Sequence, residues 1–251
     1  MGVLNVTPDS FSDGGQWLDR DAAIARGREL FSEGADVVDV GGESTRPGSE
    51  PVGIDEECRR VLGVIEALAP HGRVSVDTSK AEVAEAAVGA GATIINDVSA
   101  SLGDVAGRLG VGWIGMHMRG RPKTMQRNPT YVDVVAEVRA FLLERASAAR
   151  AAGVEELWID PGIGFGKTVD HNLTLVRNLG ALVATGYPVL LGASRKSFLS
   201  RLTGNAAATD TLEGSVAVAT YAMVAGAAMV RVHDVAATVQ AARLVSETVD
   251  A

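Results

Sequence analysis

The sequence predicts an α/β protein built as a single (β/α)8 TIM barrel, and three observations lead to this fold class. Short apolar runs recur eight times in the 251 residues, at 1–6, 37–41, 73–78, 93–98, 112–118, 157–161, 188–194 and 229–234. Stretches rich in Ala, Glu and Arg with helical spacing separate these runs. The mean repeat of about 32 residues is the length of a βα unit. About 250 residues suffice for one such barrel, so we predict one domain over 1–251.

The apolar runs are predicted to be parallel strands. They are continuously apolar rather than alternating, which is typical of strands buried on both faces. The predicted helices include 20–33, 55–69, 80–89 and 131–152, and the fourth helix is expected to have only about two turns. Glycines end several of the helices, as C-terminal cap residues do: Gly34, Gly91, Gly153 and Gly186. A doubly wound open sheet is the alternative, but it favours a glycine fingerprint directly after the first strand, where this chain reads VTP.

Composition excludes several classes of protein. With 47% hydrophobic residues the chain can form a core, and no apolar run approaches the roughly 20 residues of a membrane helix. The formal net charge of −8 argues against nucleic acid as the main partner. The single cysteine, Cys58, cannot form an intramolecular disulfide. No secretory signal is visible, so we expect a cytoplasmic protein that binds neither nucleic acid nor membrane.

Polar side chains stand where nearly every predicted strand ends. Barrel enzymes carry their chemistry at the C-terminal ends of the strands, so this pattern predicts one active site. A single such residue is often only a helix cap, and Asp77, in the run DTS before a helix, fits that interpretation equally well. The residues at the strand ends are Asn5, Asp77, Asn96, Asp160, Lys196, Arg231 and His233.

The types of these residues indicate two subsites. Asp77, Asn96 and Asp160 suit a planar heterocycle with amidine-like N–H groups, because a carboxylate accepts two parallel hydrogen bonds. Asn5 offers a neutral oxygen to a hard cation such as Mg²⁺, which takes the rest of its shell from water and substrate phosphate. The cationic and donor groups suit a phosphate or diphosphate, and they are Thr45, Arg46, Lys196, Arg231 and His233.

Three glycine-rich segments follow predicted strands. VTPDSFSDGG at 6–15 and GGESTRPG at 41–48 are long for βα loops, so we expect them to be mobile lids. Phe11 indicates that the first lid covers something apolar. GIGFGKT at 162–168 looks like a phosphate-binding loop, but Pro161 occupies the position that requires glycine, and we reject that interpretation. For His117, which ends a strand, a structural and a catalytic role remain open.

Eight stretches of the chain, in order, resemble the dihydropteroate synthase family of bacterial folate biosynthesis. They extend over nearly the whole sequence, and the first, second and seventh are specific. The stretches are GVLNVTPDSFSDGG (2–15), DVGGESTRPG (39–48), VSVDTSK (74–80), INDV (95–98), MHM (116–118), DPGIGFGK (160–167), GASRKSF (192–198) and RVHDV (231–235).

The resemblance implies a transferase that joins 6-hydroxymethyl-7,8-dihydropterin diphosphate to 4-aminobenzoate. Diphosphate would leave by an SN1-like path with Mg²⁺ as the cofactor, and the product would be 7,8-dihydropteroate. The resemblance further implies that the enzyme is a homodimer. Two alternatives are a methyltetrahydrofolate:corrinoid methyltransferase, which has no reason for the diphosphate-binding residues, and a non-catalytic pterin-binding paralogue, which would be expected to lose lid or diphosphate residues that this chain retains. A synthase variant that tolerates sulfonamides is a third.

The resemblance also assigns roles to individual residues. Catalytic roles would fall on Asp77, Lys196, Arg231 and His233. Binding of the pterin and its diphosphate would fall on Thr45, Asp77, Asn96, Asp160, Lys196, Arg231, Val232 and His233. The 4-aminobenzoate would lie near Phe11, Thr45, Arg46, Pro47 and Ser197, and Asn5 would hold the metal.

Overall fold

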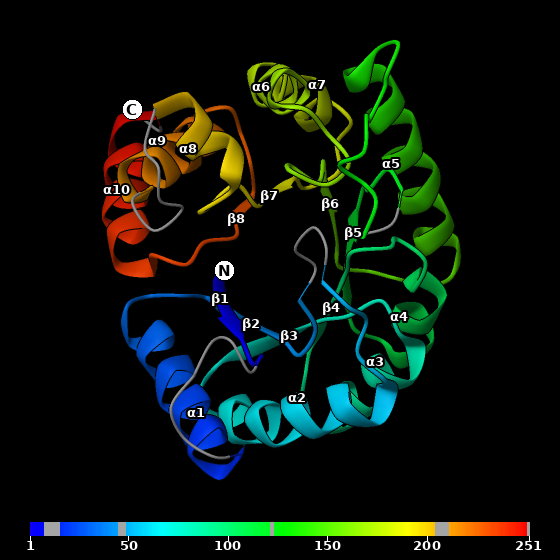
Figure 1. The fold of residues 1–251 in the computed structure, drawn as a ribbon, viewed down its shortest axis with the longest axis vertical. Coiled ribbons are helices and arrows are strands. Elements are labelled where there is room, and N and C mark those ends of the chain that lie inside the picture. Colours follow the sequence, from blue (N-terminus) through cyan, green and yellow to red (C-terminus); the bar gives the residue numbers. More distant parts are fainter. Residues whose placement is uncertain (8–15, 45–48, 121–122, 204–210, 250–251) are drawn as a thin grey trace.

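Strands and helices alternate along the chain in the computed structural model, which describes residues 1–7, 16–44, 49–120, 123–203 and 211–249 (Figure 1). The strands are β1 (Gly2–Asn5), β2 (Val37–Gly41), β3 (Arg73–Asp77), β4 (Ile94–Asp97), β5 (Gly112–Met116), β6 (Leu157–Asp160), β7 (Leu190–Leu191) and β8 (Met229–Val230). All eight predicted strands are thereby confirmed, with the last two much shorter than expected.

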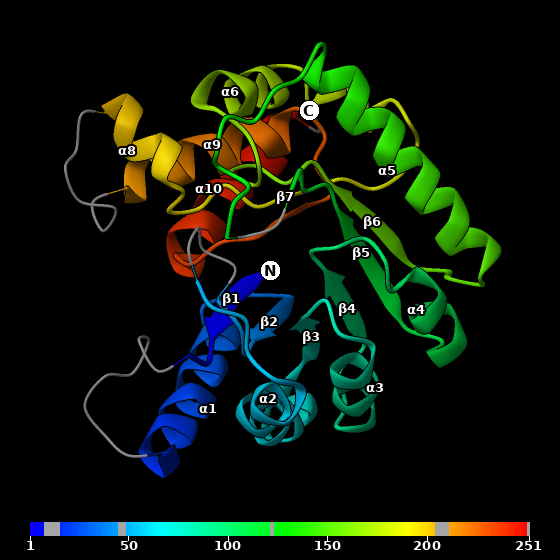
Figure 2. The same cartoon turned by 45° about the vertical axis from the view of Figure 1, so that its right-hand side comes forward.

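Helices follow the strands and lie outside them (Figures 1 and 2). The predicted short fourth helix is confirmed, because α4 has seven residues. Short α7 and α8 and a 3-10 turn at Ala69–His71 were not expected. The helices are α1 (Gln16–Ser32), α2 (Ile54–Leu68), α3 (Ala81–Gly89), α4 (Gly103–Leu109), α5 (Val134–Ala151), α6 (Val169–Arg177), α7 (Gly180–Val183), α8 (Ser197–Thr203), α9 (Leu212–Val224) and α10 (Val235–Val249).

The parallel strands follow one another in sequence order around a ring. β1 to β6 form one sheet, and β7 pairs with β8. Isolated parallel bridges join the two sheets, from Ile159 to Val189 at one seam and from Gly2 to Val232 at the other. The arrangement confirms the predicted α/β barrel class.

The strand register brings the polar strand ends to one level. Asn5 pairs with Gly41, Gly41 with Asp77, and Asp77 with Asn96. At the other side of the sheet Met116 pairs with Asp160. Because neighbouring parallel strands in register point their side chains to the same face, the C-terminal rim collects side chains from segments far apart in sequence.

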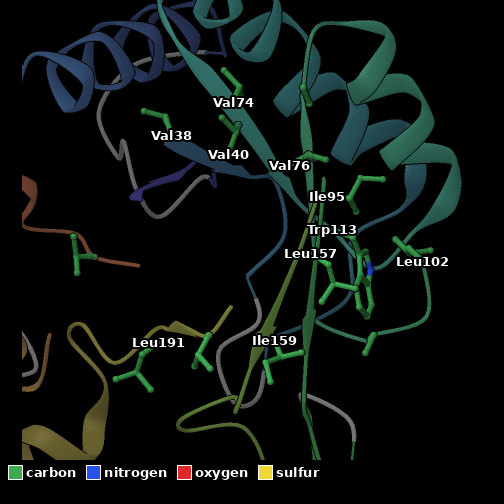
Figure 3. Packing of buried hydrophobic residues seen from close by; sticks show 14 of the residues in the cluster. Val38, Val40, Val74, Val76, Ile95, Leu102, Trp113, Leu157, Ile159 and Leu191 are labelled. Carbon is green, nitrogen blue, oxygen red and sulfur yellow. The ribbon is translucent and has the colours of Figure 1, made fainter. Parts of the chain in front are cut away.

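The apolar core has two parts. The larger part contains the strand residues that face the helices, such as Val38, Val40, Val74 and Val76 (Figure 3). The smaller part contains residues of the alternate strand positions, namely Met1, Val37, Ile94, Ile114, Trp158 and Leu190. The strands are not uniformly apolar inside, as the continuous apolar runs suggested, because Asp39 and Ser75, which pair across β2 and β3, are fully buried polar residues.

Left-handed glycines end the helices as predicted. Gly34, Gly91, Gly153 and Gly186 have φ values of 103°, 112°, 97° and 81°. Such values cost a glycine little because it has no Cβ. Within the described part of the chain, none of the helices has the length and hydropathy needed to cross a membrane.

Candidate active site

Arg231, directly after β8, bonds to carboxylates of two neighbouring strands at the rim. Arg231 Nε donates to Asp39 Oδ2 at 2.6 Å, and its Nη2 donates to Asp77 Oδ2 at 2.8 Å. The same Asp39 oxygen accepts a hydrogen bond from Asn96 Nδ2 at 2.9 Å. The buried Asp39 carboxylate therefore fixes both the Arg231 guanidinium and the Asn96 amide, two groups that the sequence predicted to belong to different subsites.

Asp39 is the functional residue that sequence reasoning missed. It is fully buried, and its Oδ1 has no hydrogen-bond partner in the structure. The available signal was a lone acid in the apolar run VVDVG, two residues before the strand end. Because side chains alternate along a strand, that position shares the face of Gly41 at the rim.

Asp77 belongs to this site and does not cap a helix. The following helix, α3, begins at Ala81, and its N-cap position is Lys80. Burial raises the pKa of Asp77 to about 7, although the Arg231 charge acts in the opposite direction. A largely buried carboxylate that keeps a small exposed surface beside a guanidinium is suited to stabilise charge on a bound ligand.

Asp160 and Lys196 form the other side of the rim. Asp160 Oδ1 accepts the Gly162 backbone N–H at 2.7 Å, and burial raises the pKa of this carboxyl. Burial lowers the pKa of Lys196 to about 8, opposed by the Asp160 charge. The Lys196 ammonium lies 4.0 Å from the ring centroid of Phe165, a cation–π contact.

Gly192, which has no side chain, leaves space between Arg231 and Asp160. A Cβ on Gly192 would lie 3.7 Å from Arg231 Cβ and 3.8 Å from Asp160 Oδ2. Asp160 and Arg231 thus border the same space above β7. The structure brings together Asp77, Asn96, Asp160, Lys196 and Arg231, as the strand-end pattern predicted.

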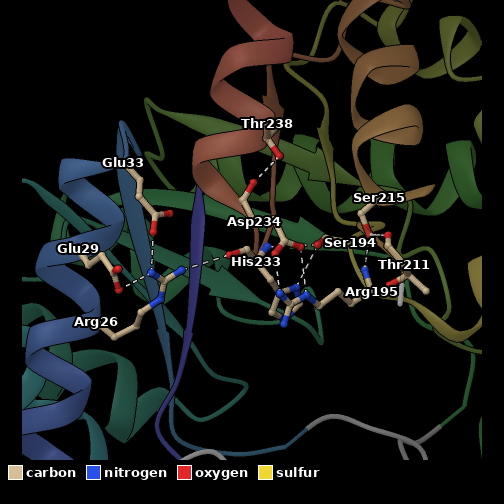
Figure 4. A network of polar contacts seen from close by, with 10 residues as sticks. All are labelled: Arg26, Glu29, Glu33, Ser194, Arg195, Thr211, Ser215, His233, Asp234 and Thr238. Atoms are coloured by element: carbon tan, nitrogen blue, oxygen red, sulfur yellow. Dashed lines mark hydrogen bonds and ion pairs between the residues drawn. The ribbon is translucent and has the colours of Figure 1, made fainter. Parts of the chain in front are cut away.

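His233 is held beside this group by Ser194 (Figure 4). The Ser194 hydroxyl accepts the His233 backbone N–H at 3.2 Å and faces the ring Nδ1 at 3.1 Å. Burial lowers the pKa of His233 to about 4, so the ring is neutral at neutral pH. It can serve as a hydrogen-bond donor to an anion but not as a cation. Nearby, Arg195 and Asp234 form an ion pair that ties the segment after β7 to the start of α10.

The candidate metal ligand Asn5 lies at the end of β1. Gly41 has no side chain, and a Cβ placed there would lie 3.7 Å from both Asn5 Oδ1 and Asp77 Oδ2. These two oxygen atoms therefore border the same space beside Gly41. Mg²⁺ prefers such donors and keeps several waters. No group of three or more His, Cys, Asp or Glu able to hold a metal occurs in the described ranges. The donor set therefore fits a Mg²⁺ that takes most of its ligands from water and substrate.

The remaining predicted ligands are less closely defined. Ser197 is the exposed first residue of α8. Val232 lies in the seam with β1, where its N–H donates to Met1 O and its carbonyl accepts from Val3 N, both at 2.9 Å. Four predicted residues lie outside the described ranges, as do most of the two expected lids: Phe11, Thr45, Arg46 and Pro47.

The GIGFGKT segment contacts two residues of this site, Asp160 through Gly162 and Lys196 through Phe165. Its lysine, Lys167, is only 2% exposed, and its ammonium contacts His117 Nδ1 at 2.9 Å. It also donates to the carbonyls of Gly162 and Phe165 at 2.9 and 3.0 Å. Burial lowers the pKa of His117 to about 3, so His117 is neutral and accepts this bond. The rejection of a phosphate loop agrees with this geometry, because the lysine points into the protein.

Comparisons with known proteins agree with the fold and show the family. The family model described as "Pterin binding enzyme" matches residues 1–233. The dihydropteroate synthase of Escherichia coli K12 is 45% identical, over 100% of this chain and 92% of the relative. The Xanthomonas albilineans dihydropteroate synthase with 4-aminobenzoic acid has a TM-score of 0.93 and 48% identity, covering 100% of this chain and 92% of its own. The Thermus thermophilus enzyme in complex with 6HMPPP has a TM-score of 0.86 and 42% identity, with coverages of 99% and 92%.

A parallel barrel with carboxylates, an amide and two cations gathered at its C-terminal rim defines a small-molecule enzyme of the TIM-barrel class. The chain belongs to the pterin binding enzymes and, among them, to the dihydropteroate synthases of the folate pathway. It is accordingly a transferase. The expected synthase, rather than a corrinoid methyltransferase or a non-catalytic paralogue, is confirmed by these relatives.

Proposed function

We propose that the rim described above binds a dihydropterin diphosphate and transfers its methylene carbon to the amine of 4-aminobenzoate, releasing diphosphate. The observation that carries this proposal is the cluster in which Arg231 bridges Asp39 and Asp77 beside Asn96. The names of two similar structures, which mention 4-aminobenzoic acid and 6HMPPP, support the two substrates.

The pterin ring would be recognised by the fixed acceptors. Asp160 uses Oδ1 for the Gly162 amide, which leaves Oδ2 for ring N–H donors. Asn96 directs its NH₂ group to Asp39, so its carbonyl oxygen is the group presented to a ligand. Hydrogen bonds between a carboxylate and such donors are charge-assisted and directional. Lys196 would supply a donor from the opposite side.

The diphosphate would be bound by Arg231 and His233, with the Thr45 hydroxyl as a third donor. Asp39 and Asp77 occupy Nε and Nη2 of Arg231, so its Nη1 edge is the one available to an anion. Such donors stabilise the charge that grows on a leaving group. Asn5 would hold Mg²⁺, which when bound neutralises part of the same charge.

Asp77 would stabilise the positive charge that develops on the pterin methylene as the diphosphate leaves. An arylamine is a weak nucleophile, which favours ionisation before attack. The cation must then be protected from water. The lid loops would provide this protection and the 4-aminobenzoate contacts, through Phe11, Thr45, Arg46, Pro47 and Ser197.

A steady-state assay tests the proposal. The chain should form 7,8-dihydropteroate from the pterin diphosphate and 4-aminobenzoate in the presence of Mg²⁺ and lose most activity in EDTA. Asn5→Ala should raise the Mg²⁺ concentration needed for half-maximal rate and leave the KM for 4-aminobenzoate near that of the parent. Product formation that does not depend on Mg²⁺, or an unchanged Mg²⁺ requirement in Asn5→Ala, would contradict the assignment of Asn5.

We further propose that the enzyme is a cytoplasmic homodimer that uses the outer faces of α9 and α10. Apolar side chains are exposed there, including Tyr221 at 47%, Val224 at 55% and Leu244 at 69%. Clusters of exposed apolar side chains favour association with another surface.

A further inference from the structure

The most deeply buried ammonium in the described part of the site region is not one that the reaction uses. Lys167 is 2% exposed, and its ammonium lies among carbonyl oxygens and His117 Nδ1, without a carboxylate in contact. Burial lowers the pKa of Lys167 to about 7. Burying a charged amine is costly, so a lysine kept at this position calls for an explanation.

The contacts of Lys167 converge on the two charged residues at the β6–β7 side of the rim. The Lys167 ammonium donates to the carbonyl oxygen of Gly162, and the backbone N–H of Gly162 donates to Asp160 Oδ1 at 2.7 Å. The ammonium also donates to the carbonyl of Phe165, whose ring lies 4.0 Å from the Lys196 ammonium. One ammonium therefore bonds to the residue whose N–H holds Asp160 and to the residue whose ring faces Lys196.

The backbone of this segment is shaped for such a contact. Gly162, Gly164 and Gly166 all have left-handed φ values, of 66°, 84° and 63°. A Cβ on Gly162 would lie 1.9 Å from the carbonyl oxygen of His117, and one on Gly166 would lie 2.1 Å from that of Arg119. The segment therefore packs directly on the backbone after β5. Buried carbonyl groups need a donor, and Lys167 provides it for one of these two, His117 O at 3.3 Å, as well as for the carbonyls of Gly162 and Phe165.

We propose that Lys167 is a positioning residue for the pterin subsite, acting through the Gly162 amide on Asp160 and through Phe165 on Lys196. The proposal rests on the assignment of Asp160 and Lys196 to the pterin. It gives the GIGFGK segment a role different from phosphate binding. The lysine never touches the substrate but determines the orientation of groups that do.

Calorimetric titration with 6-hydroxymethylpterin tests this role. Lys167→Met keeps an unbranched side chain one atom shorter and removes the donors, and we expect its Kd for the pterin to rise at least tenfold. The KM for 4-aminobenzoate should change less than twofold. The matched control is Lys123→Met, because Lys123 is an exposed lysine paired with exposed Glu50, and the change should leave both values unchanged.

A double-mutant cycle separates positioning from general stability. If Lys167 acts through Asp160, Lys167→Met should weaken pterin binding much less in an Asp160→Asn background than in the parent. Full additivity, or parent-like pterin affinity in a folded Lys167→Met, would overturn the proposal. Should Lys167→Met fail to fold, Lys167→Gln, whose shorter side chain retains only an amide donor, enters the same cycle, and its loss of pterin affinity should likewise shrink in the Asp160→Asn background. If Asp160→Asn alone leaves the pterin Kd unchanged, the pterin subsite itself is misassigned, which is a different failure.

Discussion

Arg231 illustrates how few side chains define this site. Its charge is shared between Asp39 and Asp77, which belong to adjacent strands, and Asp39 also holds Asn96. In a buried environment such bonds are strong when complete and costly when one partner is lost. The orientation of Arg231 and Asn96, the two groups proposed to bind substrate, therefore depends on a carboxylate that faces no solvent.

Replacement of Asp39 tests this dependence. Asp39→Asn keeps the size of the side chain but leaves the guanidinium without its buried counter-charge, and breaking a buried pair costs roughly 3–5 kcal/mol. We expect lower stability to urea and a loss of at least tenfold in kcat/KM for the pterin diphosphate. Asp36→Asn, at an exposed position directly before β2, is the control and should behave like the parent. A folded Asp39→Asn variant with full activity would show that Arg231 is oriented by Asp77 alone.

The titrating residues predict how activity depends on pH. Asp77, with a pKa near 7, must be ionised to stabilise a cation, and Lys196, with a pKa near 8, must be protonated to donate. The profile of kcat/KM for the pterin diphosphate should rise through about pH 7 and fall above about pH 8. In Lys196→Arg the falling limb should move to higher pH, because a guanidinium does not deprotonate in this range. An unmoved limb would assign it to another group.

At the scale of secondary-structure elements, the segments after the strands carry the function, and the strands hold them in register. The segment after β6 is the best-defined case, since its left-handed glycines bring it against the backbone that follows β5. Helix α6 begins directly afterwards with a capping box between Thr168 and His171, which fixes the far end of the segment. Support from both ends allows a loop to position a carboxylate.

Two glycine replacements distinguish backbone strain from a role in the site. Gly186 has a φ of 81° and open space where a Cβ would stand, so Gly186→Ala should cost about 1–2 kcal/mol of stability and leave pterin affinity intact. Gly162→Ala carries similar strain and also collides with the His117 carbonyl. We expect a larger loss of stability and pterin binding weakened at least tenfold, measured by urea unfolding and calorimetry. Equal effects of the two changes on pterin affinity would contradict the role given to Gly162.

At the scale of the whole molecule, the strands of the ring differ in length and in how they are paired. β1 to β6 form a continuous ladder, whereas β7 and β8 have two residues each and join the rest through isolated bridges. The late helices α9 and α10 pack against each other outside this thinner part. A partner subunit on these helices would stabilise the part of the barrel with the fewest strand pairs.

The expected homodimer can be tested at the exposed apolar positions. Sedimentation velocity should give the parent a mass twice 26.0 kDa. Val224→Lys places a charge on the exposed face of α9 and should produce monomers at micromolar concentration, because an unpaired charge opposes burial of the surface. Val132→Lys, at a fully exposed position before α5, should remain dimeric. A monomeric parent, or a dimeric Val224→Lys variant, would exclude α9 as the interface.

The sequence by itself determined the fold class, the order of the strands and the identity of most rim residues. The spacing of apolar residues, the glycines that end helices and the polar residues at strand ends are local features of the sequence. They were enough to place five residues at the rim: Asp77, Asn96, Asp160, Lys196 and Arg231. Only the tertiary structure decided which of these residues bond to one another. Strand register brings Asp39 to Arg231, which lies 192 residues away in the sequence, and the left-handed segment after β6 brings Lys167 to His117, 50 residues away. Sequence spacing carries no geometric information over such separations. Burial, which shifts the pKa values of Asp77, Lys196 and His233, is likewise a property of the assembled barrel and not of any one segment.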